Sequence, residues 1–275
     1  KKLQKPSDDP ALATKINNLK SQIDVNQRYL TNLNRMEDTL KMQESTVAGS
    51  IDLVARIKEL SIQGANDTYS ASDRKTMAIE VKELIRALAD LGNMRGTDGA
   101  YLFSGYSQGQ APFSEASTGA VTYTGSADSL KVMVDDGRSM QLGISGADIF
   151  GNVEHLNTST GATSRIDLFA SLNTMYEALV TNDGDAIRNN IDKVSSVHEH
   201  IIAQQSNIGS RMKRLETLTH AVEDKDYTYK LLQSNMEDLN YIEAASRLKN
   251  QSLALQAGQQ TFTQLSDLSL FKYIR

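Results

Sequence analysis

Apolar residues recur at alternating steps of three and four residues between Ile16 and Val54. This series has twelve positions, and nine of them are apolar, while Asn26, Glu37 and Glu44 occupy the other three. Such spacing places the apolar side chains along one stripe of an α-helix and is typical of helices that pack lengthwise on one another. We call this stripe the heptad seam. It predicts a long bundle helix rather than a strand.

A second helix is predicted after "GANDTYSASD" (64–73), a turn-forming stretch in which Ser70 or Ser72 is placed to cap the helix. Helical spacing then continues without a fault through five apolar residues, Met77, Val81, Leu84, Leu88 and Leu91.

Helical spacing returns in the second half of the chain, over 166–179 and 187–222, on either side of the turn signal "NDGD" (182–185). The charged stretch "AVEDKDYTYK" (221–230) predicts a break or bend. A last amphipathic helix is expected from there to the end of the chain.

The middle of the chain differs, because glycine is dense and short alternating runs appear, as in "VTYTG" (121–125), "KVMV" (131–134) and "SMQLGI" (139–144). Between the last two runs, "DDGR" (135–138) is a hairpin turn signal. We expect "NTSTGATS" (157–164) to be a linker out of this region.

The predicted fold class is therefore mainly α with an inserted β domain, an elongated antiparallel helical bundle with a small β-rich domain. The expected division is a discontinuous bundle domain (6–95 and 165–225), an inserted β-rich domain (96–164) and a C-terminal helix (226–275).

Two adjacent carboxylates in "KPSDDP" are the first candidate site, either as half of a metal site or acid/base pair, or as the start of a helix. Ser7 suits a helix N-cap, and Asp8 and Asp9 would lie in the first turn, where the helix dipole favours negative charge. Pro10 is tolerated in that turn because its missing N–H costs nothing there. The cap explains all four residues and is preferred.

No catalytic, metal or cofactor site is expected elsewhere. His198 and His200 lie two residues apart, so on a helix they point in different directions and cannot share a metal ion. The chain has no Cys, and a net charge of −5 gives no reason to expect nucleic acid or an anionic membrane as a partner. Its longest apolar runs are too short to span a membrane.

Several motifs, in this order, resemble the axial proteins of the bacterial flagellum, the flagellin-like family. They are "PSDDPALA" before a long heptad helix, "KELSIQGANDTYSASDRKTMAIEVKEL" (58–84) and "AVEDKDY" (221–227). Two further stretches, "NMRGTDGAYLFSGYSQGQAPF" (93–113) and "LSLFKYI" (268–274), are similar to the hook-associated members at the hook–filament junction.

The resemblance implies a structural, non-enzymatic subunit outside the cell, exported unfolded without a cleaved signal peptide. Implied partners are the hook-side junction protein, flagellin, further copies of the chain in a ring, and a cytoplasmic export chaperone. Filament flagellin itself and a coiled-coil adhesion or signalling module remain as alternatives.

Contacts for assembly and for the chaperone are expected on the C-terminal helix. Family members also begin with a further helix before "PSDDP", so we expect this chain to lack that segment and its terminal helix to lack a partner. The candidate contact residues are Met236, Leu248, Leu255, Phe262 and Leu265.

Overall fold

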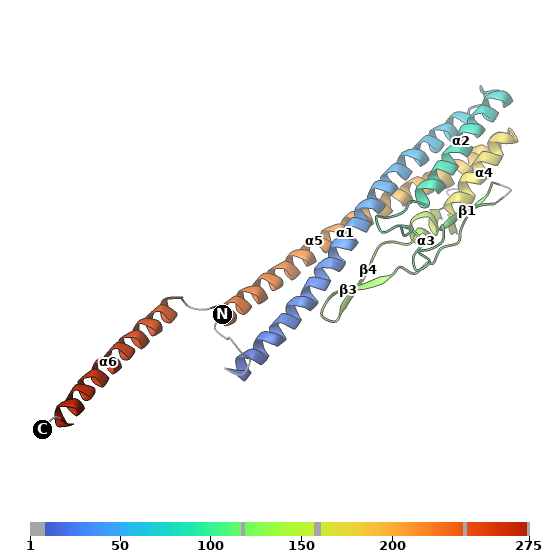
Figure 1. Ribbon diagram of the computed structural model, residues 1–275. Helices are drawn as coiled ribbons and strands as arrows, with labels where there is room; N and C mark the ends of the chain where they lie inside the picture. The colour runs from blue at the N-terminus through green and yellow to red at the C-terminus, as the bar shows by residue number, and fades with distance from the viewer. Residues whose placement is uncertain (1–8, 117–118, 157–160, 239–240, 274–275) are drawn as a thin grey trace. The chain divides into compact units, whose positions relative to one another are not determined.

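A computed structural model describes residues 9–116, 119–156, 161–238 and 241–273. These residues form mainly helices, with small antiparallel strand pairs between them, so the predicted fold class is confirmed (Figure 1). The helices are α1 (Pro10–Gly64), α2 (Ala71–Gly92), α3 (Gly146–Phe150), α4 (Leu168–Val180), α5 (Gly184–Glu237) and α6 (Tyr241–Tyr273). The strands are β1 (Phe113–Glu115), β2 (Val121–Tyr123), β3 (Lys131–Asp135), β4 (Arg138–Gln141), β5 (Val153–Leu156) and β6 (Thr163–Ile166).

The chain divides into two compact units. The larger unit is Gln27–Glu223, and the smaller unit combines Lys1–Asn26 with Asp224–Arg275. Helices α1 and α5 contribute to both units.

In the larger unit α1 and α5 run side by side (Figure 1). The heptad seam of α1 is buried at Leu33, Leu40 and Val47, which belong to one apolar core with Ile201 and Ile208 of α5. A polar interruption of the seam is also satisfied across this pair, because Gln205 Nε2 of α5 donates to Glu44 Oε1 at 3.0 Å. The heptad seam is thus the face on which α1 packs.

The same two helices meet in the smaller unit. Ile16 and Leu19 of α1 are buried there, and Lys20 Nζ lies 2.6 Å from Glu237 Oε1 of α5. In the larger unit, Glu44 of α1 meets Gln205 of α5. Asp67, just past the end of α1, pairs with Arg188 at the start of α5. The two helices are therefore antiparallel there.

The predicted break at 221–230 is wrong, since α5 continues through these residues to Glu237. The stretch contains neither Gly nor Pro, and its charges support the helix, because Lys230 Nζ pairs with Asp226 Oδ2 one turn away at 2.7 Å. The last helix, α6, begins only at Tyr241.

The turn between α1 and α2 contacts the turn between α4 and α5. Of the two serines that the sequence offers as a cap, Ser70 is the one that caps α2, in a capping box with Asp73, whereas Ser72 lies inside the helix. The buried Arg74 then ties this turn to the one between α4 and α5, because Nε donates to the Gly64 carbonyl at 2.8 Å and Nη1 donates to Asn182 Oδ1 at 2.7 Å. The "NDGD" turn is confirmed between Val180 and Gly184.

The β-rich insert consists of three separate two-stranded antiparallel pairs, β1–β2, β3–β4 and β5–β6. The hairpin predicted at "DDGR" is confirmed as β3–β4, with Gly137 at a φ of 65° in its turn. The prediction of a linker at 157–164 is wrong for its last two residues, because β6 begins at Thr163 and pairs with β5. Residues 157–160 lie outside the described part.

An aromatic cluster attaches the insert to the bundle. The ring of Phe113 lies 5.2 Å from that of Phe150 and 5.2 Å from that of Phe169 in α4, while Phe103 meets Phe150 edge-on at 5.5 Å. All four rings are buried, so this cluster extends the bundle core into the insert.

The second attachment is polar and depends on Gln43 in the middle of α1. Its Nε2 donates to the carbonyls of Leu102 (2.7 Å) and Ile144 (2.9 Å), and its Oε1 accepts from the Ile144 N–H at 3.0 Å. Gln43 is completely buried, so its amide replaces the partners that these backbone groups would otherwise lack. We call this arrangement the Gln43 clamp.

Replacing Gln43 by Ala should destabilise the protein by about 2–4 kcal/mol, because it leaves one N–H and two carbonyls of the insert without partners in a buried place. Urea unfolding followed by circular dichroism measures this loss. The exposed Gln27 on the same helix provides the control, and its replacement by Ala should change the unfolding free energy by less than about 0.5 kcal/mol. Equal effects of the two substitutions would contradict the clamp.

Candidate functional site

An exposed apolar stripe on α6 is the first candidate site. Tyr241, Leu248, Leu255 and Phe262 are spaced exactly seven residues apart, and each is at least 65% exposed. Leu265, one turn beyond Phe262, is exposed as well. A strict seven-residue repeat keeps the large side chains on one line along a helix, as in coiled coils. This set of residues is called the α6 stripe below.

A small apolar hollow lies within the α6 stripe. It is lined by Leu255, Gly258, Gln259 and Phe262, together with Thr263. The first four stand at positions i, i+3, i+4 and i+7, which is the spacing of the hole that receives a knob side chain in helix packing. Gly258 has no side chain to fill this hollow, and a Cβ at this position would meet no atom within 4 Å. The α6 stripe therefore has the surface shape of a helix-packing interface.

The predicted contact residues are only partly brought together. Leu248, Leu255, Phe262 and Leu265 share one face of α6, whereas Met236 lies near the end of α5 and is partly buried. The spacing of apolar residues could not reveal that Met236 belongs to α5, because the break before the last helix was expected at 221–230.

The "SDDP" element is described from Asp9 onward, while Ser7 and Asp8 lie outside the described residues. Asp9 precedes α1, and its Oδ1 accepts from the Leu12 N–H at 2.9 Å, with Pro10 as the first helical residue. This is the geometry of an N-cap. The described carboxylate therefore caps the helix rather than lying inside its first turn.

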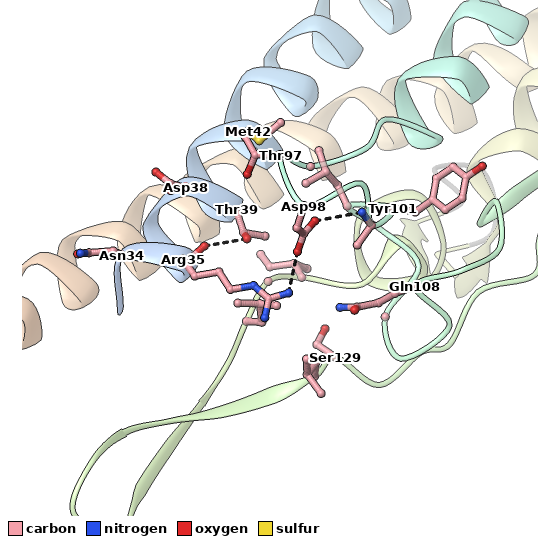
Figure 2. Close-up of a pocket in the computed structure, with 18 of the residues that line it drawn as sticks. Asn34, Arg35, Asp38, Thr39, Met42, Thr97, Asp98, Tyr101, Gln108 and Ser129 are labelled. Atoms are coloured by element: carbon pink, nitrogen blue, oxygen red, sulfur yellow. Dashed lines mark hydrogen bonds and ion pairs between the residues drawn. The ribbon is translucent and has the colours of Figure 1, made fainter. Parts of the chain in front are cut away.

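A crevice of about 320 Å³ between α1 and the insert is the second candidate site (Figure 2). At its mouth Arg35 Nη2 of α1 pairs with Asp98 Oδ2 of the 93–102 loop at 2.7 Å. Asp98 Oδ1 accepts from the Ala100 N–H at 3.0 Å. This backbone N–H first, and then Arg35, hold the pKa of the Asp98 carboxyl below its ordinary value. Asp98 is thus ionised at neutral pH.

Two of the four histidines, His155 and His200, connect the insert with α5. The buried His155 of β5 lies with Nδ1 3.0 Å from Ser196 Oγ, and His200 Nε2 contacts the Asp148 carbonyl at 3.1 Å. Burial, and then Lys58, lower the pKa of His198. Over the described ranges, no three His, Cys, Asp or Glu residues gather where they could hold a metal ion. None of the described helices has the length and apolar content needed to cross a membrane.

Two family models match this chain. The bacterial flagellin N-terminal helical region matches residues 1–108, and the bacterial flagellin C-terminal helical region matches residues 191–274. The two matches cover most of α1, α2, α5 and α6 and leave out the greater part of the β-rich insert.

Among curated proteins, flagellar hook-associated protein 3 of Salmonella typhimurium is 28% identical, with 100% of this chain and 90% of the relative covered. The Escherichia coli protein of the same name is also 28% identical, over 99% of this chain and 89% of its own length. A flagellar filament 33 kDa core protein of Treponema phagedenis is 27% identical over only 38% of this chain and 36% of its own length.

Solved structures show the same fold. FlgL of Xanthomonas campestris superposes with a TM-score of 0.70 at 18% identity, covering 78% of this chain and 99% of that one. Hook-associated protein-3 of Legionella pneumophila gives a TM-score of 0.71 at 17% identity, covering 80% and 98%. With both flagellin helical regions matched in order and hook-associated proteins similar along its whole length, the chain belongs to the bacterial flagellin family, among its hook-associated members.

Proposed function

We propose that this protein is a structural subunit of the bacterial flagellum at the junction between hook and filament. The observation that carries the proposal is its similarity to hook-associated protein 3 of two species, over at least 99% of this chain and at least 89% of each relative. The α6 stripe supports it, because a row of exposed apolar side chains on a formed helix suits a subunit that completes its packing in an assembly.

Filament flagellin is the second candidate, and the family models alone are compatible with it. The filament proteins of Treponema, however, match only 104 residues of this chain, which is 38% of its length. The hook-associated relatives match the β-rich insert as well as the helices. The junction role is therefore favoured over the filament role.

In this function the protein acts by contact and catalyses no reaction. The helical bundle supplies the body of the subunit, the β-rich insert (96–164) faces outward, and α6 (Tyr241–Tyr273), rather than the whole of 226–275, carries the contacts with neighbouring subunits. The partners are the hook-side junction protein on one side, flagellin on the other, and copies of the chain in a ring. Before export, a chaperone holds the C-terminal helix in the cytoplasm; after export, the protein lies outside the cell.

Cells that lack this protein should complete their hooks and export flagellin, yet release it into the medium unpolymerised, because the filament has no surface on which to start. Immunoblots of culture supernatants and electron microscopy of the cells measure both parts of this result. Expression of the full-length protein in the same cells should restore filaments. Filaments of normal length in the deletion strain would contradict the junction role.

Replacing Leu255 by Asp should abolish assembly and leave the fold unchanged. The side chain is 65% exposed, so a charge there costs the free protein little, whereas a charge buried in a helix interface is strongly unfavourable. Circular dichroism reports the fold, and restoration of filaments in the deletion strain reports assembly.

Leu253→Asp is the matched control for this substitution. Leu253 is also exposed on α6, but two residues along a helix turn the side chain by about 200°, so it lies away from the α6 stripe. We expect this variant to assemble. Loss of helical signal in Leu255→Asp, or equal loss of assembly in both variants, would count against the α6 stripe as the contact surface.

A further inference from the structure

Three polar side chains converge in the crevice between α1 and the insert. Figure 2 shows the guanidinium of Arg35, the amide of Gln108 and the hydroxyl of Ser129 pointing toward one another. They come from three separate segments, namely α1, the loop before β1 and the approach to β3. The fold therefore brings together groups that the sequence keeps far apart.

Ser129 is the most informative of the three. Its residue is only 6% exposed, yet among the described residues its hydroxyl has no hydrogen-bond partner. The Ser129 oxygen is not among the buried side-chain atoms that lack a partner, so it is accessible from the crevice that Ser129 lines. Because this hydroxyl is aimed into an open crevice, a molecule that enters the crevice can satisfy it.

Arg35 determines which chemical class fits. A guanidinium carries five N–H donors, and Arg35 uses one of them, on Asp98, within the part of the chain that the structure describes. Its remaining donors form the planar fork that matches the two oxygens of a carboxylate. The Gln108 amide and the Ser129 hydroxyl add donors beside that fork, so the crevice favours an anion with two oxygens.

The volume and the charged residues of the crevice further limit the class of ligand that fits. A volume of about 320 Å³ is at the lower end of ligand sites and suits one side chain rather than a nucleotide. Asp98 already neutralises part of the charge of Arg35, and Asp38 also lines the crevice, so a highly charged anion such as phosphate is disfavoured.

We propose that this crevice is a binding site for a single carboxylate, and that in the assembled flagellum it receives an Asp or Glu side chain of an adjoining axial subunit. The carboxylate contacts Arg35 through two oxygens, with Gln108 and Ser129 as further donors. The occupant rests on the proposed junction function, whereas the carboxylate preference of the crevice does not.

The chemistry can be tested on the free protein with glutarate as the probe and the uncharged glutaramide as its control. We expect glutarate, and not glutaramide, to shift the NMR signals of the Arg35 Nε–H and Gln108 amide in a saturable way. Arg35→Gln should abolish the glutarate shift of the Gln108 amide, and Ser129→Ala should weaken binding. No saturable shift, or an equal shift with glutaramide, would overturn the site.

The variant Asp98→Asn distinguishes a binding site from an ion pair that only connects α1 with the loop. The Asn side chain still accepts from the Ala100 N–H, while Arg35 loses a competing charge. We therefore expect glutarate to bind about 2–5-fold more tightly, the change that corresponds to a partly exposed ion pair. If Asp98→Asn instead weakened binding, the Arg35–Asp98 pair would serve only to hold the loop, and the proposal would be wrong.

The occupant is tested in the deletion strain. We expect Arg35→Gln to reduce the fraction of cells with filaments severalfold and Asp98→Asn to leave it unchanged. Normal filaments with Arg35→Gln, despite glutarate binding to the wild-type protein, would overturn the proposed occupant. This outcome differs from failure of the junction role itself, which the deletion strain alone reports.

Discussion

Antiparallel packing of α1 on α5 is the interaction on which the other parts of the structure depend. The two helices have 55 and 54 residues, far longer than the loops and strands between them. Their buried side chains form the core that α2, α4 and the insert extend. Long helices obtain most of their stability from such a packed face rather than from intrinsic propensity, so loss of this contact would expose much of the shared core.

The larger unit and α6 differ in how their apolar side chains are covered. In the larger unit apolar side chains and polar interruptions are both satisfied, as Glu44 and Gln43 illustrate. On α6 the large apolar side chains face water, although the backbone is already helical. The larger unit thus buries its apolar side chains within the chain, whereas α6 leaves its own exposed, and the proposed function covers them with a neighbouring subunit.

Much of the helical architecture is predictable from sequence, because it depends on periodicity and turn chemistry. The heptad seam locates α1, the serines at 70 and 72 mark the start of α2 to within two residues, and "DDGR" marks a hairpin. The break expected at 221–230 fails because charge was taken as a sign of a turn, whereas Asp226 and Lys230 pair within the helix. Neither the Gln43 clamp nor the crevice could be predicted, since each joins residues about 60 to 100 positions apart.

The Gln43 clamp has a consequence for how the outer part of the molecule can diversify. Gln43 recognises the carbonyls of residues 102 and 144 and the N–H of residue 144, groups that any residue other than proline at position 144 would present in the same backbone conformation. Attachment at this point therefore depends on the backbone of the insert and on Gly143, where a Cβ would lie 2.9 Å from Gln43 Nε2. The surface of the insert can acquire new charges, new loops or a new antigenic character while its hydrogen-bonded attachment to α1 stays the same.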